Sequence, residues 1–385
     1  MTAILETLKA AAMAGVDAAA DRSWKLALEI FANPELSGNE YLAREACTAL
    51  LASAGFEIRD ISGLPTGFVA SLDGDREGPA VGFLAEYDAL PGIGHGCGHH
   101  LIAGSAIAAA IGLAGVRKDL AGTVKVFGCP AEETLTGKRA MLEVGVFDNL
   151  DAALTFHAHD ATTVMTRSTG SREVTFSFEG QPSHAATEPW AGASALDGVL
   201  LTMQNVNALR QLVQDGVRIH GIVTAGGDAH NVVPAFAQCR FGIRSADLDE
   251  LSRVVRRVVD CAHAGAMASS TTLTIEYGAM ADPVRPDPAL ADFMRANLEV
   301  LGERVVDWDA HASTDFGDVC QVLPGVLVSV ATWPQGTPFH SYEAAAHGDA
   351  DMARAAMTQG ARAMALTALD YIEHFQDSAN QEEMQ

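Results

Sequence analysis

Gly94-His95-Gly96-Cys97-Gly98-His99-His100 places three imidazoles and a thiol on one glycine-rich turn. This segment follows an apolar, strand-like run at 81–84 and precedes an apolar, helix-like run at 101–116. Glycine lets the backbone turn sharply, so side chains that are close in sequence can point at one centre. Thiolate and imidazole together are ligands for zinc and its first-row neighbours. The segment therefore predicts a metal site on a strand–loop–helix unit.

The composition is that of a globular protein that is large enough for two domains. The chain has 385 residues, of which 48% are hydrophobic and 19% are charged, and this length allows two domains with sizeable cores. Its formal net charge is -24, and negative charge repels nucleic acid and anionic lipid. We therefore expect neither a nucleic-acid partner nor a membrane partner.

The cysteines and the N-terminus favour a cytoplasmic protein. The cysteine spacing matches neither a Cys-x-x-Cys pair nor a secreted disulfide framework, and reduced thiols are typical of the cytosol. The first residues lack a basic region followed by an apolar core, so no signal peptide is expected. The longest apolar run, at 101–116, is shorter than the roughly 20 residues that cross a membrane.

Alternating helix and strand patterns predict an α/β fold with a central mixed sheet flanked by helices. The predicted helices of this part are 2–32, 40–55, 101–116, 137–145, 287–302 and 349–374, followed by a polar tail at 376–385. The predicted strands are 56–61, 68–72, 81–85, 122–129, 152–156 and 326–331. Such sheets place functional loops at the carboxyl ends of strands, which is where the motifs of this chain occur.

The pattern changes near residue 170, where a smaller α+β insert begins. Its predicted strands are 172–179, 221–226, 239–245 and 271–277, and its predicted helices are 191–214 and 247–267. Three prolines between 283 and 288 mark the return to the first pattern. The predicted domains are therefore 1–169 and 281–385, which form one domain, and the insert 170–280.

Adjacent carboxylates, Glu132 and Glu133, follow the predicted strand at 122–129. Neighbouring side chains on a loop point in different directions, so one carboxylate can bind a metal ion while the other faces a substrate. A bound ion lowers the pKa of its water toward about 7. A free carboxylate beside that water can take its proton and later deliver it to a leaving nitrogen. The pair is typical of a hydrolytic metal site.

Further histidines follow other predicted strands. His157 ends one strand, His159 lies two residues on, and His340 follows the strand at 326–331; either His157 or His159 could coordinate a metal. The five candidate ligands are Cys97, His99, Glu133, His157 and His340. Five ligands exceed one open tetrahedral site, but they suit two ions about 3.5–4 Å apart that share a bridging group.

The insert carries three hydrogen-bond donors in turn or strand-end positions: His184, Asn231 and Arg244. A protonated imidazole, an amide and a guanidinium can hold a carboxylate or a tetrahedral oxyanion. Each could equally be an ordinary turn or surface residue. Their function depends on whether the insert brings them together as a lid.

Taken together, these motifs resemble the M20 metallopeptidase family. They are most similar to its amidohydrolase branch, in particular the aminobenzoyl-glutamate hydrolase and dipeptidase-like group. The matching segments occur in order through nearly the whole chain. They are Pro34–Glu40, Phe83–Pro91, Gly94–His99, Pro130–Glu133, Asp151–His157, Ser183–Ala186, Asn231–Pro234, Ser313–Gly317 and Gly336–Ser341.

The resemblance implies a catalytic α/β domain interrupted by an α+β lid that also forms a homodimer. It implies that all five candidate ligands bind metal, that Glu132 is the general base and acid, and that Asp88 orients the site from behind the ligands. It further implies that His184 stabilises the oxyanion in the partner subunit's site, and that Asn231 and Arg244 face the substrate.

Some residues depart from the pattern of that branch. His100 stands where Asp or Asn is common, Cys129 stands where Gln is common, and His159 replaces the proline of a His-Pro pair. The segment 135–138 replaces a more glycine-rich one. These departures leave the acyl group and the leaving amine open.

The sequence therefore predicts a metal-dependent hydrolase of a C–N amide bond. The expected substrate is a small N-acyl amino acid, an aminobenzoyl-glutamate-like compound or a dipeptide. One or two divalent ions are expected, with zinc favoured by the thiol and manganese, cobalt or nickel as alternatives. Three alternatives stay open: a hydrolytic deaminase of an aromatic amine, a non-catalytic relative that binds metal or ligand, and a structural dimer module built on the insert.

Overall fold

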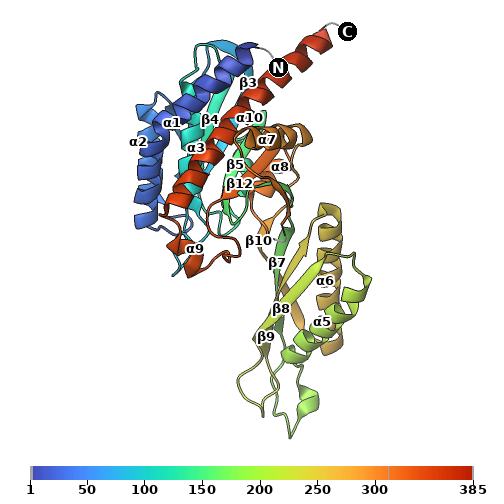
Figure 1. The fold of residues 1–385 in the computed structure, drawn as a ribbon. Helices are drawn as coiled ribbons and strands as arrows, with labels where there is room; N and C mark the ends of the chain where they lie inside the picture. The colour runs from blue at the N-terminus through green and yellow to red at the C-terminus, as the bar shows by residue number, and fades with distance from the viewer. Residues whose placement is uncertain (1–2, 311, 384–385) are drawn as a thin grey trace. The chain divides into compact units, whose positions relative to one another are not determined.

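A computed structural model of the chain describes residues 3–310 and 312–383. The chain forms two compact units. Unit 1 comprises Met1–Arg167, Arg285–Ala310 and Asp318–Gln385, and unit 2 comprises Ser168–Val284 and His311–Gly317. Helices and strands alternate in unit 1 (Figure 1), and the predicted α/β class is confirmed. The division into a catalytic domain and a lid at 169/170 and 280/281 stays a prediction.

Unit 1 is built on an eight-stranded mixed sheet in the order β1-β2-β4-β3-β5-β12-β6-β11. Its strands are β1 (Glu57–Ile61), β2 (Leu64–Asp73), β3 (Arg76–Glu86), β4 (Ala121–Cys129), β5 (Ala152–His159), β6 (Thr163–Arg167), β11 (Val306–Asp309) and β12 (Gly325–Ala331). The central strands β4, β3, β5 and β12 run parallel to one another. Their runs of buried Val, Phe and Leu are typical of strands that are covered on both faces.

Helices cover this sheet. They are α1 (Ala3–Ala32), α2 (Tyr41–Ser53), α3 (His99–Ala114), α4 (Gly137–Glu143), α7 (Pro288–Val300), α9 (Tyr342–Ala346) and α10 (Asp351–Glu383), and the short helix α8 (Phe316–Cys320) begins in unit 2 and ends in unit 1. The apolar helix α3 is buried from His99 to Leu113. It packs on the sheet and against the long helices α1 and α10, which also pack against each other, and α10 contacts the sheet itself (Figure 1).

The four central strands β4, β3, β5 and β12 all end at one edge of the sheet. In the register of β3 and β4, Glu86 pairs with Cys129, and in that of β5 and β12, His159 pairs with Ala331. The segments that follow these four strands therefore emerge side by side. This topology brings together motifs that are far apart in sequence.

Unit 2 is a four-stranded antiparallel sheet in the order β10-β7-β9-β8 with two helices. Its elements are β7 (Gly170–Glu179), α5 (Ala195–Leu209), β8 (Arg218–Ala225), β9 (Phe236–Ser245), α6 (Leu248–Ser269) and β10 (Thr272–Ala281), with short 3-10 turns at Pro189–Ala191 and Arg210–Leu212. The helices pack on β7 and β9 around a core that includes Phe176, Phe178 and Phe241. This arrangement agrees with the predicted α+β insert.

The structure corrects two of the expected elements. The segment 376–385, expected to be a polar tail, continues α10 as far as Glu383, because it contains no glycine or proline to stop the helix. The expected helix 191–214 is shorter: α5 begins after Ser194, whose hydroxyl accepts a hydrogen bond from the Asp197 amide and caps the helix.

Two strands of the sheet, β6 and β11, were not expected. Both are short, and they pair in parallel at the end of the sheet order. A segment of four or five residues is too short to show a clear alternation of buried and exposed side chains. β6 is positioned by pairing with β12 and β11 by pairing with β6, and sequence patterns do not reveal such pairings.

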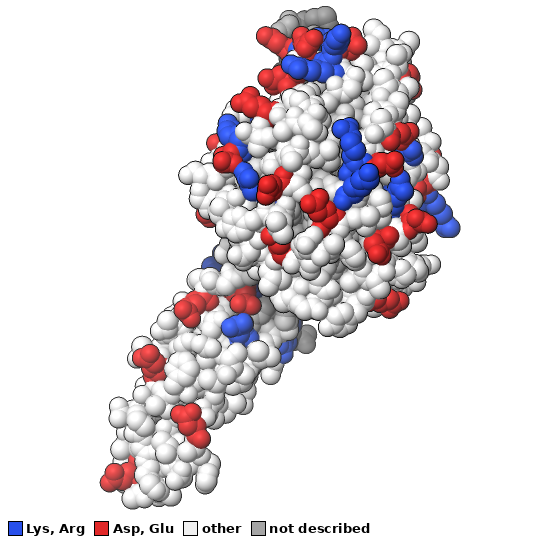
Figure 2. Space-filling model, turned by 90° about the vertical axis from the view of Figure 1, so that its left-hand side faces the viewer, with Lys and Arg blue, Asp and Glu red and all other residues white. Residues whose placement is uncertain are grey.

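The surface carries charges of both signs. Figure 2 shows acidic and basic side chains interspersed over the face in view, with an excess of acid in the whole chain. Within residues 3–310 and 312–383, no helix is long and apolar enough to cross a membrane.

Gly112 sets the close approach of α1 and α3, and its replacement tests that packing. A Cβ at Gly112 would lie 2.4 Å from Val16 Cγ2 and 2.9 Å from the Ala12 carbonyl oxygen. Overpacking typically costs about 1–3 kcal/mol, so Gly112→Ala is expected to lower the melting temperature by several degrees in calorimetry.

The control for this substitution is Gly226→Ala, whose Cβ would meet nothing closer than Leu196 Cδ1 at 3.5 Å. Equal melting temperatures for the two variants would contradict the argument that Gly112 is needed for close packing.

Candidate metal centre

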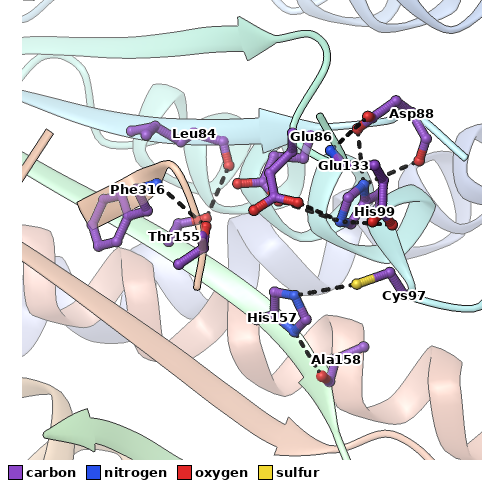
Figure 3. A network of polar contacts seen from close by, with 12 residues as sticks. Leu84, Glu86, Asp88, Cys97, His99, Glu133, Thr155, His157, Ala158 and Phe316 are labelled. Carbon is purple, nitrogen blue, oxygen red and sulfur yellow. Dashed lines mark hydrogen bonds and ion pairs between the residues drawn. The ribbon is translucent and has the colours of Figure 1, made fainter. Parts of the chain in front are cut away.

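The candidate centre collects side chains from the segments that leave one edge of the unit 1 sheet. They come from the end of β3 (Glu86), the next loop and the start of α3 (Cys97 and His99), the loop after β4 (Glu132 and Glu133), β5 (His157) and the loop after β12 (His340). Figure 3 shows Glu86 and Glu133 turned toward His99, with His157 facing Cys97. The structure thus brings all five predicted ligands into unit 1.

Gly98 allows the turn between Cys97 and His99 to approach β5. Its φ is +82°, in the left-handed region. A Cβ at this position would also lie 2.5 Å from the Ala158 Cβ. Because no larger side chain fits, glycine here lets α3 begin against the strand that carries His157.

The ligand atoms are spaced as they would be around metal ions. Two atoms bound to one tetrahedral ion at about 2.0–2.3 Å lie roughly 3.3–3.8 Å apart. Cys97 Sγ is 3.6 Å from His157 Nε2, and His340 Nε2 is 3.7 Å from Glu133 Oε2. Both distances fall in that range.

The candidate ligands form three groups, and within each group the ligand atoms lie within 4.8 Å of one another. They are Cys97 with His99 and His157, Cys97 with Glu133 and His340, and Glu86 with His99 and Glu132. Since Cys97 belongs to two groups, its sulfur is positioned to be shared between two ions. The third group includes Glu86, which sequence reasoning did not identify.

The imidazole of His99 is oriented by Asp88. His99 Nδ1 lies 2.9 Å from Asp88 Oδ1 and donates to that carboxylate, so Nε2 keeps its lone pair for a metal. Nε2 faces three carboxylates: it is 3.7 Å from Glu86 Oε2, 3.6 Å from Glu132 Oε2 and 3.8 Å from Glu133 Oε1. A lone pair surrounded by carboxylate oxygens is the environment of a bound cation.

Unsatisfied polar atoms test whether these residues fit a metal. Among the described residues, Glu86 Oε2, His99 Nε2 and Glu133 Oε1 are buried and have no hydrogen-bond partner. Buried polar atoms without partners are unfavourable and rare. Glu86 Oε2 and Glu133 Oε1 lie 3.7 Å and 3.8 Å from His99 Nε2, so the donor set fits a divalent cation.

The electrostatic environment keeps these groups in different protonation states. Burial raises the pKa of Asp88, but His99 and hydrogen bonds from Ser37 and the Glu133 amide outweigh it and lower the pKa to about 2. Burial lowers the pKa of His157 to about 4, so this ring is neutral and can bind metal. Burial raises the pKa of the Cys97 thiol to about 12, so a nearby cation is needed to form the thiolate.

The backbone of two loops is strained beside the centre. Ala131, just before Glu132, has a φ of 57°, and His340 has a φ of 55°. Such conformations cost non-glycine residues about 1–3 kcal/mol and cluster at functional sites. The Ala131 turn is held by buried Glu40, whose Oε1 accepts a hydrogen bond from the Ala131 amide at 2.9 Å.

The predicted substrate residues lie in unit 2. The amides of Ala186 and Thr187 and the Thr187 hydroxyl lie 3.1–3.2 Å from His184 Nδ1, and the two amides donate to it. In the neutral ring the proton is therefore on Nε2. Asn231 is next to His184 in space, because its carbonyl accepts a hydrogen bond from Ala185.

Arg244 also lies in unit 2, where its guanidinium donates to Ser313 Oγ at 2.8 Å. Burial lowers its pKa from the ordinary value for arginine. The catalytic or substrate-binding roles expected for His184, Asn231 and Arg244 stay predictions.

The three unusual residues noted in the sequence have separate surroundings. His100 is buried, with Nε2 2.9 Å from the Gly348 carbonyl oxygen. Cys129 is buried at the end of β4 and donates to the Phe127 carbonyl. His159 Nδ1 lies 2.9 Å from Asp160 Oδ1, and its ring touches aromatic side chains.

Aromatic side chains flank the candidate ligands His157 and His340. The Phe339 ring centroid lies 6.1 Å from that of His157 and 5.2 Å from that of His159. The ring centroid of Trp308 on β11 lies 4.3 Å from that of His159, and the Trp308 ring is parallel to the Phe339 ring. We name Trp308, His159 and Phe339 the aromatic wall. Sequence reasoning missed it because β11 was not recognised as a strand.

Comparison with known families identifies the chain. The model of peptidase family M20/M25/M40 matches residues 82–378, a range that contains every candidate ligand. The chain belongs to this family. The predicted recognition as an M20 protein, and with it the prediction of an enzyme of this class, is confirmed.

Individual M20 relatives match over nearly the full length. The chain is 34% identical to an Xaa-Arg dipeptidase of Mus musculus, over 96% of the chain and 90% of the relative. It is 29% identical to one of the subunits of the p-aminobenzoyl-glutamate hydrolase of Escherichia coli, over 92% and 90% respectively. A Bacillus subtilis structure described as a dinuclear metal binding M20 peptidase has a TM-score of 0.73 and 21% identity, over 93% of this chain and 99% of that one.

The overlapping ligand groups predict different metal losses for two variants. Cys97→Ala removes a donor from two groups and is expected to lose most bound metal, whereas His340→Ala removes a donor from one group and is expected to retain one ion. Inductively coupled plasma mass spectrometry of dialysed protein measures ions per chain.

Cys47→Ala, which removes a buried thiol in α2, is the control and should keep the wild-type metal content. Full metal content in Cys97→Ala would argue against the shared sulfur.

Proposed function

We propose that this M20 protein hydrolyses the C–N amide bond of a small substrate, a dipeptide or an N-acyl amino acid. The observation that carries the proposal is the different placement of two adjacent carboxylates. Glu133 reaches toward both His99 and His340 with its two oxygens, whereas Glu132 has one oxygen 3.6 Å from His99 Nε2. This difference supports a role of Glu133 as a metal ligand and of Glu132 as the group that moves a proton beside it.

The chemistry divides between the metal and the side chains. Bound divalent ions would polarise the substrate carbonyl and make water acidic. Glu132 takes a proton from the attacking water and delivers it to the departing nitrogen, as a general base and then a general acid. Asp88 holds the His99 ring, and Cys97, His99, Glu133, His157 and His340 would hold the ions.

Unit 2 supplies the donors for the oxygen that gains charge. Because two backbone amides donate to His184 Nδ1, the proton of the neutral ring is on Nε2. This N–H can donate a hydrogen bond to an oxyanion. Asn231 and Arg244 are proposed to bind the substrate, and a carboxylate is the group that a guanidinium suits best.

We also propose that unit 2 forms a homodimer. Its last strand in the sheet order, β8, carries Ile222 and Val223, which are 61% and 45% exposed. An exposed apolar edge strand is a template for pairing with another chain. In this proposal His184 serves the partner subunit's site.

The ligand set supports two ions, because Cys97 can belong to two groups. Sulfur and nitrogen donors favour zinc, with manganese, cobalt or nickel as alternatives. The description of the Bacillus subtilis relative as dinuclear supports the same number.

The aromatic wall favours a substrate with a flat ring. Phe339 is 38% exposed, and its ring centroid lies 6.1 Å from that of His157 and 6.3 Å from that of Trp308. Aromatic rings contribute about 0.5–1.5 kcal/mol when they stack against one another. An aryl acyl group or an aromatic side chain therefore suits this wall better than an acetyl group.

Glu132 and Glu133 should respond differently to the same substitution. Glu132→Gln is expected to lower kcat by about 10²–10⁴-fold while the protein keeps its metal, because the lost group moves a proton. Glu133→Gln should lose metal, because it removes a ligand. Steady-state kinetics and metal analysis on the same preparations measure both effects.

Near-normal turnover in Glu132→Gln would sink the general-base assignment. Metal loss in Glu132→Gln equal to that in Glu133→Gln would show that the two carboxylates share one role.

A matched substrate series tests the aromatic wall. Phe339→Leu is expected to raise KM for an N-benzoyl amino acid by about 3–10-fold and to leave KM for the N-acetyl compound unchanged. Phe375→Leu is the control, because Phe375 on α10 is 39% exposed. Product masses from the same series, extended to dipeptides and aryl amines, measure which bond breaks.

Equal changes in KM for the benzoyl and acetyl compounds would contradict a role of the wall in specificity. Release of ammonia from an aryl amine, with both amides intact, would favour the deaminase. No turnover of any compound by metal-loaded protein would favour a non-catalytic relative.

A further inference from the structure

Glu86 and Lys138 form a buried ion pair at the end of β3. Glu86 is 2% exposed and Lys138 is fully buried, and Lys138 Nζ lies 2.7 Å from Glu86 Oε1. An ammonium at this distance favours the ionised form of a buried carboxyl group. Glu86 is therefore a carboxylate with one oxygen engaged by Lys138.

The second oxygen of Glu86 has a different environment. Oε2 is buried without a hydrogen-bond partner and lies 3.7 Å from His99 Nε2. This separation is too long for a hydrogen bond, but it is the separation of two ligands on one ion. Figure 3 shows the Glu86 carboxylate directed at His99 from the opposite side to Asp88.

We propose that Glu86 is an additional ligand of the ion bound by His99, and that Lys138 is the positioning residue that holds it there. This inference rests on the proposed metal dependence. Lys138 fixes Oε1, so Oε2 keeps its direction toward His99. The ion expected at this position is a divalent first-row cation with more oxygen donors than the five predicted ligands alone would supply.

A purely structural role of Glu86 would not explain the position of its second oxygen. If Glu86 served only as the counter-ion of Lys138, nothing would hold its second oxygen buried, unpartnered and near the oxygens of Glu132. Like charges in a buried site repel unless a cation lies between them. A shared cation satisfies Glu86 Oε2 and His99 Nε2 together.

The test uses Co²⁺ as a spectroscopic probe of the full-length protein. Glu86→Gln keeps the size of the side chain and a partner for Lys138 but removes the anionic oxygen. We expect the affinity for one of the bound Co²⁺ ions to fall by about 10–100-fold, and the d–d bands to shift. The thiolate charge-transfer band from Cys97 should remain, because Glu86→Gln leaves the sulfur in place.

Two further variants separate positioning from ligation. Lys138→Met should weaken the same ion, and the Glu86→Gln/Lys138→Met double variant should lose no more affinity than Glu86→Gln, because Lys138 acts through Glu86. If Glu86→Gln does not fold, Glu86→Asp keeps the charge and withdraws the oxygen, and it should show the same shift of the d–d bands.

Glu250→Gln is the matched control. Glu250 in unit 2 is 4% exposed and pairs with Arg253, so its substitution disturbs an acid–base pair of the other unit and should leave Co²⁺ binding unchanged.

Co²⁺ affinity and spectra of Glu86→Gln equal to those of the wild type would overturn the inference and leave the proposed function standing. Failure of the wild type to bind Co²⁺, Zn²⁺ or Mn²⁺ would overturn the proposed function itself, and this inference with it.

Discussion

The common end of four parallel strands is the constraint on which the candidate centre depends. β4, β3, β5 and β12 lie side by side with one direction, so the loops that follow them meet at one edge. Each loop or strand end contributes donors that could not form a site alone. α3 fixes the level of His99, because Gly98 lets the helix begin against β5. The sheet thus supplies the geometry, and the loops supply the chemistry.

Buried charge links this geometry to a cation. Glu86, Asp88, Glu132 and Glu133 lie around one imidazole, and Lys138 offsets part of their charge from within the protein. Carboxylates that are removed from water need a positive partner. Because the unfolded chain has no such site, ion binding stabilises the folded unit. The stability of unit 1 is therefore expected to rise with its metal content.

The sequence was informative where residue type and strand position agreed. Cys97, His99, Glu133, His157 and His340 are residue types that bind metals, and each follows or ends an apolar strand pattern, so their convergence in unit 1 could be anticipated. Glu86 and Lys138 could not, because a Glu or Lys is ordinarily a surface residue, and only tertiary packing shows that this pair is buried. The aromatic wall was missed for another reason: Trp308 lies on a four-residue strand whose pairing is non-local.

The donors around the centre are chemically unequal, and this bears on which metal it holds. The preference for zinc read from the sequence rests on one soft donor, Cys97. Glu86, which lies beside His99, would add a carboxylate oxygen, and oxygen donors suit harder ions such as manganese. Cys97 and His157 would supply sulfur and nitrogen to a bound ion, whereas Glu86 would supply oxygen. We therefore expect the metal selectivity of the centre to depend on the balance between these donor types, with His99 present in both groups.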